Sequence, residues 1–239
     1  MPVIWEEEDG ALVPLEGRRL QEAREELWED EPTFAADAYL DQALTARVEI
    51  LKFFDRFCSL IWLHRTITAG VTRASDEHAR LRQTGQHRVP GWEGESDLGL
   101  DQDRDLVEEA AAIGDGAIIA ATAAALESLT VDLLDRPGDT AHHRKGLQHK
   151  IETLIDRWPF MPDIEGMRDD IKWIAERRNS FAHNLLDEAS NGWRIRKPWT
   201  FDNAAVEEAF ARTGNVAARL AIGWERHLQG PARLRTSAA

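Results

Sequence analysis

The amino-acid sequence predicts an all-α protein. Apolar residues recur every three to four positions along most of the chain, whereas the alternating pattern typical of strands is scarce. The chain has 239 residues, of which 43% are apolar and 30% are charged, and it contains only nine prolines. This composition describes a soluble globular protein that can bury one large core, or one domain together with an accessory arm.

The N-terminal residues are strongly acidic. Residues 1–31 contain 11 Asp or Glu and three Arg, so we expect an extended arm followed by a helix at about 15–28. Such an arm is either a solvated terminus or an acidic segment that shields a basic site on its own or a partner chain.

A long helix is expected after this arm. Thr33 can cap it, its apolar pattern runs to about Ala69, and residues 71–83 continue the same pattern. We interpret His64 and His78 in this stretch as packing or surface residues, because no repeated spacing links them.

Residues 84–99 form the clearest break in helical periodicity and predict a loop or hinge between two helical parts. Three aspartates then follow at alternate positions, at 101, 103 and 105, as at the start of a calcium-binding loop. However, Leu106 stands where that loop needs glycine, and Ala112 stands where it needs glutamate. We therefore expect a helix at 105–134 and no calcium site.

The helix at 105–134 has one face of small residues, namely Ala110, Gly114, Ala117, Ala121 and Ala124. Small residues let another helix approach closely, either within the chain or across a subunit interface.

Three further helices are expected, at about 144–158, 164–189 and 201–228. Asp163 can cap the second of them, and Gly230-Pro231 is expected to stop the third. Between the last two, tryptophans alternate with Arg194 and Arg196 in a short strand or extended loop. We divide the chain into an N-terminal acidic arm with long accessory helices (1–100), a helical domain (101–230) and a disordered tail (231–239).

The charge distribution limits the classes of partner. The net charge of −14 argues against a general nucleic-acid coat, but residues 144–200 hold 11 Lys or Arg against nine Asp or Glu. No signal peptide opens the chain, and the longest uncharged apolar run is too short to span a membrane. The single Cys58 fits a reducing cytoplasm, so we expect a cytoplasmic protein without membrane attachment.

The helix around Ile171–Leu186 contains an arginine that packing does not explain. Arg178 falls inside the apolar stripe of this helix, where a guanidinium is costly unless a polar group receives it. Asn179 and His183, four residues apart, border the same stripe.

The string Arg178-Asn179-Ser180-Phe181-Ala182-His183 resembles the signature of the HEPN superfamily (higher eukaryotes and prokaryotes nucleotide-binding domain), an Arg followed after four to six residues by a His. The resemblance covers about residues 101–229. It implies a HEPN-like helical bundle, a metal-independent endoribonuclease without cofactors, and a toxin–antitoxin or antiviral abortive-infection system. It also implies a homodimer in which two copies of the motif face one cleft, with an antitoxin or defence-system protein as a further partner.

The chemistry of these residues fits RNA cleavage. His183 can act as base or acid, Arg178 can bind a phosphate bidentately, and Asn179 can orient the imidazole or contact substrate. Arg178 and His183 point about 140° apart around the helix at 100° per residue, so a symmetric dimer is needed to bring both to one phosphate. We expect Arg177, on the solvent side, to contact the RNA backbone together with the two arginines of the 193–199 segment, and Glu176 to pair with His183.

Two functions other than RNA cleavage remain open. One is a HEPN module without catalysis, which binds a nucleotide or a protein. The other is an unrelated helical regulator in which Arg178 pairs with a buried carboxylate. If Arg178 is buried against a carboxylate in a monomer, the nuclease hypothesis fails. His142, His143 and His149 lack the spacing of a zinc site and are expected to be surface residues.

Overall fold

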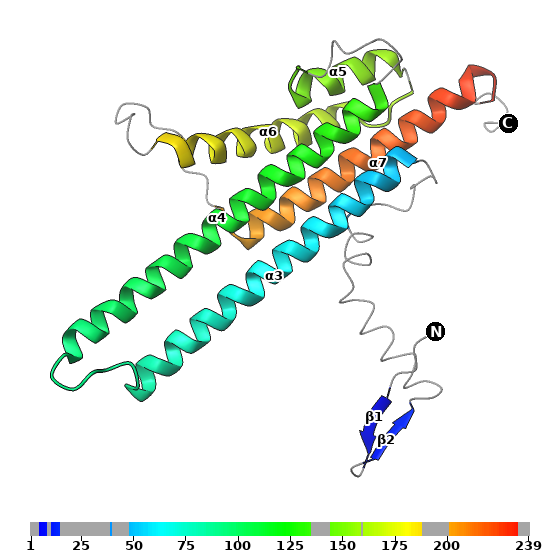
Figure 1. The fold of residues 1–239 in the computed structure, drawn as a ribbon. Helices are drawn as coiled ribbons and strands as arrows, with labels where there is room; N and C mark the ends of the chain where they lie inside the picture. Colours follow the sequence, from blue (N-terminus) through cyan, green and yellow to red (C-terminus); the bar gives the residue numbers. More distant parts are fainter. Residues whose placement is uncertain are drawn as a thin grey trace.

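The computed structural model describes residues 5–8, 11–14, 39, 48–134, 144–158, 160–187 and 201–233. Over these ranges the chain forms five helices, which confirms the predicted all-α class, and one short β hairpin (Figure 1). The helices are α3 (Val48–Thr84), α4 (Glu93–Leu134), α5 (Leu147–Arg157), α6 (Ile164–Asp187) and α7 (Asn203–Arg233). Figure 1 shows α3, α4 and α7 running side by side, while α6 crosses α4 and the short α5 lies at one end of the bundle.

The acidic N-terminal segment contains the hairpin. Strand β1 (Trp5–Glu8) pairs antiparallel with β2 (Ala11–Pro14), and Trp5 lies opposite Pro14. The sequence predicts an extended arm here, and the structure adds the pairing of its two halves. The helix expected at 15–28 and the capping position Thr33 lie outside the described residues.

The break predicted at 84–99 is shorter than expected. Helix α3 continues past Gly70 to Thr84, and α4 already begins at Glu93, so only residues 85–92 connect the two antiparallel helices. Gly85 and Gly91 adopt positive φ angles of 67° and 83°, which glycine tolerates best. The acidic residues after Gly91 belong to the first turns of α4, where they complement the helix dipole.

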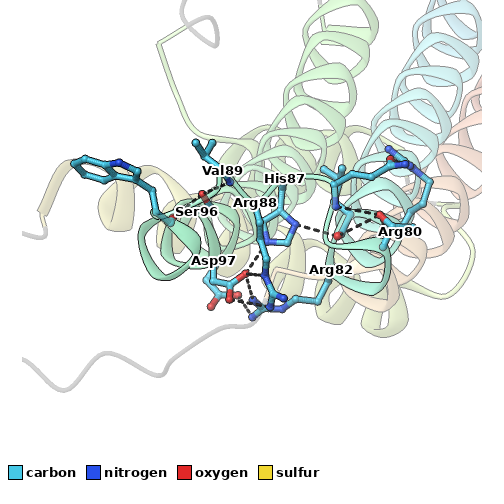
Figure 2. A network of polar contacts seen from close by, with 12 residues as sticks. Arg80, Arg82, His87, Arg88, Val89, Ser96 and Asp97 are labelled. Carbon is cyan, nitrogen blue, oxygen red and sulfur yellow. Dashed lines mark hydrogen bonds and ion pairs between the residues drawn. The ribbon is translucent and has the colours of Figure 1, made fainter.

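Asp97 of α4 accepts hydrogen bonds from residues of this connection (Figure 2). It accepts hydrogen bonds from Arg88 Nε, at 3.0 Å, and from His87 Nε2, at 2.7 Å, and these contacts lower its pKa to about 2. The other ring nitrogen of His87, Nδ1, lies 2.9 Å from the carbonyl oxygen of Leu81. Because a carboxylate and a carbonyl both accept, both contacts are hydrogen bonds only when the imidazole carries two protons.

One hydrophobic cluster joins all five helices. It contains Phe53 and Phe57 from α3, Ile151 from α5, Ile171 from α6 and Phe210 from α7, all at most 1% exposed. The domain boundary expected at residue 100 falls inside α4, and the cluster contains side chains from both sides of it.

Helix α7 extends further than predicted. It ends at Arg233, so Gly230-Pro231 lies within its last turn and does not stop it. Pro231 has no N–H to donate to the carbonyl oxygen four residues earlier, so α7 contains the proline at the loss of one backbone hydrogen bond in its last turn. Residues 234–239 of the expected tail lie outside the described part of the chain.

Helix α4 is also long and apolar enough, by length and composition alone, to cross a membrane. Half of its apolar window is buried against the rest of the protein, and a core helix of a soluble protein meets the same criterion.

Candidate functional site

Helix α6 carries the Arg178 motif and is anchored at both ends. Asp163 caps it by accepting from the backbone N–H of Gly166 at 3.1 Å, as the sequence predicts. Near the other end, Phe181 is 9% exposed and its ring lies directly over Gly116 of α4. A side chain at position 116 would occupy the space of that ring, so the glycine sets the distance between α6 and α4.

Arg178 has the polar partner that its place in the apolar stripe requires. Its Nη1 donates to Glu127 Oε2 of α4 at 2.8 Å, and Lys150 Nζ of α5 donates to the other oxygen at 2.7 Å. The side chain of Lys150 is 2% exposed and that of Glu127 is 19% exposed, whereas that of Arg178 is 40% exposed. We call Glu127, Lys150 and Arg178 the charged triad.

The charged triad bears directly on the alternatives left open by the sequence. Arg178 does pair with a carboxylate of its own chain, as the helical-regulator hypothesis expects. However, the Arg178 side chain is only partly buried, and only one of its nitrogens bonds to a described residue. Its remaining N–H groups can therefore still meet a ligand.

Of the two other residues predicted to be catalytic, the structure describes the side chain of Asn179 alone. Asn179 is exposed, and residue 183 follows one helical turn later. The side chain of His183 lies outside the described part of the structure, and so do Arg194 and Arg196. The expected pairing of Glu176 with His183 is therefore not described either; Glu176 itself is exposed.

Arg177 does not project freely into solvent as the sequence predicts. Its guanidinium lies 3.9 Å from the ring centroid of Trp173, the side chain is half-buried, and burial lowers its pKa. Arg212 of α7 lies over the same ring at 5.1 Å, so two guanidinium groups contact one indole. The i,i+4 spacing of Trp173 and Arg177 is the sequence signal for the first contact, whereas no spacing within α6 reveals the contact with Arg212.

A second ion-pair network, which the sequence does not reveal, joins α6 to α7. Asp170, 8% exposed, accepts from Arg212 at 2.9 Å and from Arg219 at 2.7 Å, and Arg219 also donates to Asp163. The only sequence signal is the seven-residue spacing of the two arginines, which places them on one face of α7. These contacts fix the orientation of α6.

The described residues contain no group of three or more His, Cys, Asp or Glu that could hold a metal ion. Two of the histidines considered for such a site, His142 and His143, lie outside them, and the exposed His149 is on α5.

Comparison of the chain with protein-family models, with curated proteins and with solved structures found no match.

Proposed function

We propose that the chain is a metal-independent endoribonuclease of the HEPN type, acting in the cytoplasm as a toxin or antiviral defence effector. The observation that carries the proposal is the arrangement on α6, where Arg178 is held by Glu127 yet 40% exposed, beside the exposed Asn179. The order of α4 to α7, with a long helix, a short helix, the motif helix and a closing helix, supports a HEPN-like bundle.

Each motif residue has a role in this chemistry. Cleavage without metal needs a base for the 2′-OH, an acid for the leaving 5′-oxygen and a cation for the phosphorane. Arg178 supplies the cation through the N–H groups that Glu127 leaves unoccupied, and His183 transfers the proton. Asn179 orients the imidazole or the substrate. Arg194 and Arg196 contact the RNA backbone.

The charge of the triad supports anion binding at Arg178. One carboxylate faces two cations, so the triad keeps a formal charge of +1, and the more exposed cation is Arg178. A phosphate can approach this end of the triad but not Lys150, which is buried.

A homodimer through α6 completes the proposed site. Within one chain, Arg178 and His183 project about 140° apart at the helical period of 100° per residue, so the His183 acting beside a given Arg178 comes from the partner copy. A small antitoxin or another defence-system protein is the partner that would restrain such an enzyme.

A HEPN module without catalysis, which binds a nucleotide or a protein, is the second candidate. It is favoured by the bond between Glu127 and Arg178, because a carboxylate already occupies one edge of the guanidinium.

The test is incubation of the purified chain with total RNA in EDTA, beside Arg178→Ala and His183→Ala. Arg168→Ala is the matched control, because Arg168 is an exposed arginine of α6 that also pairs with a glutamate, Glu152. We expect cleavage by the wild type and by Arg168→Ala, and loss of cleavage in both motif variants. Cleavage that persists in both motif variants, or that is absent from the wild type in every RNA pool, would contradict the proposal.

A further inference from the structure

A groove of about 520 Å³ lies between α3 and the start of α7 and shares no residue with the charged triad. Its volume is within the range of roughly 300–1,000 Å³ that is usual for small-molecule sites. It exists because of a change in side-chain size along α3. The rings of Phe57 and His64 lie 5.4 and 5.9 Å from the ring of Phe210 on α7, whereas beyond His64 the lining residues Thr68 and Thr72 are short.

A buried histidine lines this groove next to a carboxylate. His64 is 4% exposed, and its Nε2 lies 3.4 Å from Asp115 Oδ1 of α4 without the alignment of a hydrogen bond. The Asp115 side chain is itself only 13% exposed.

The polar groups around the groove are unevenly paired. The carboxylate of Glu207 accepts from the Tyr39 hydroxyl. By contrast, no hydrogen bond or ion pair joins Thr68, Thr72 or Arg73 to another residue of the described chain. A threonine within a helix often donates its hydroxyl to the backbone carbonyl oxygen four residues earlier. Thr66, on the same helix but outside the groove, does so to Trp62 at 2.9 Å.

Two hydroxyls and one guanidinium thus remain for a ligand, and Asp76 is the groove carboxylate with no partner among the described residues. Thr68 and Thr72 are one turn apart on α3 and Arg73 follows Thr72; all three side chains are exposed and line the groove. A carboxylate one turn further on suits a hydroxyl donor attached to that anion.

We propose that this groove binds the phosphate ester of a sugar. Thr68, Thr72 and Arg73 hold the phosphate, and Asp76 accepts from a sugar hydroxyl. This chemistry is shared by a free sugar phosphate and by the backbone of a nucleic-acid strand. The proposal is independent of RNA cleavage at Arg178.

The test is isothermal titration of the full chain with ribose 5-phosphate, and with ribose as the ligand that lacks the phosphate. We expect saturable binding of ribose 5-phosphate and binding of ribose that is at least about tenfold weaker. Arg73→Gln should weaken ribose 5-phosphate at least about tenfold and Thr72→Val about three- to tenfold, as for charged and neutral hydrogen bonds. Thr66→Val should bind as the wild type does.

A second titration with a 2′-deoxy oligonucleotide distinguishes the two sources, because it offers the backbone but cannot be cleaved through a 2′-OH. Displacement of ribose 5-phosphate by the oligonucleotide supports a strand-binding groove, and its failure to displace supports a free sugar phosphate. The proposal is overturned if neither probe binds, or if Arg73→Gln and Thr72→Val both leave binding unchanged. RNA cleavage, measured in parallel, reports on the proposed nuclease and not on this groove.

Discussion

Replacement of Glu127 by glutamine is the sharpest test of the charged triad. The substitution keeps the size of the side chain and removes the single negative charge between Lys150 and Arg178. Arg178 can turn toward water, because its side chain is 40% exposed, but Lys150 is 2% exposed and cannot. Glu127→Gln therefore leaves a buried ammonium without a counter-charge.

The expected cost follows from that burial. Breaking a buried ion pair by removing one partner costs about 3–5 kcal/mol, because the remaining charge is uncompensated. For a chain of this size, each kcal/mol lowers Tm by about 2–4 °C, so we expect a fall of roughly 6–20 °C. Lys150→Met removes the buried charge instead and should cost less than about 1.5 kcal/mol. In the double variant, the loss of free energy of unfolding should be close to that of Lys150→Met alone.

The assay is urea denaturation followed by circular dichroism, with Glu152→Gln as the matched control. Glu152 of α5 pairs with Arg168 of α6 at 2.8 Å, but both side chains are well exposed, so this control should lose less than about 1 kcal/mol. If Glu127→Gln loses no more free energy of unfolding than Glu152→Gln, the inference that Lys150 depends on Glu127 is refuted.

Two further predictions concern the packing of α6 and the α3–α4 connection. Gly116→Ala should destabilise the protein by about 1–2 kcal/mol in urea, because the new methyl group would lie 2.2 Å from a ring atom of Phe181. Gly94→Ala has open space and should be stabilising or neutral, so equal effects of the two would argue against the close packing. In the folded protein the pKa of Asp97 is about 2, below its usual 3.8. The contribution of Asp97 to the free energy of unfolding is therefore complete above pH 4 and is lost as pH falls toward 2. The stability difference between wild type and Asp97→Asn should therefore shrink over that interval, and a constant difference would show that the contacts of Asp97 with Arg88 and His87 do not depend on its charge.

Periodicity predicts which segments are helical, because the buried face of each helix repeats along the sequence. It places α5 and α6 within about three residues and identifies Asp163 as the cap of α6. It misplaces the start of α4, since Gly94 and the acids around it look like a loop in isolation. The contacts of Asp97 with Arg88 and His87, across the connection, fix this turn of helix.

Partners between helices are less accessible to sequence reasoning. The phase of α6 predicts that Arg178 needs a polar partner but not which residue supplies it. Glu127 is 51 residues away in the chain, and Lys150 is a further contact 23 residues from Glu127. Neither spacing is periodic, because it depends on how α4, α5 and α6 pack against one another. The same limit applies to His64 and Asp115, which only the packing of α3 on α4 brings together.

The net charge of the triad separates phosphate binding by Arg178 from a purely structural role of its bond with Glu127. With Lys150 and Arg178 both facing Glu127, the formal charge is +1, and Lys150→Met reduces it to zero while leaving the bond between Arg178 and Glu127 in place. If Arg178 binds a phosphate, this buried substitution should raise KM for RNA several-fold, because a neutral triad attracts an anion less strongly, and the effect should diminish at high salt. A scaffold that uses Arg178 only to hold α4 against α6 predicts no change in RNA binding, since that bond persists. The comparison requires that the variants and the wild type have the same stability in urea. If Lys150→Met then leaves KM unchanged while Arg178→Ala loses activity, Arg178 acts through its position and not through the charge of the triad.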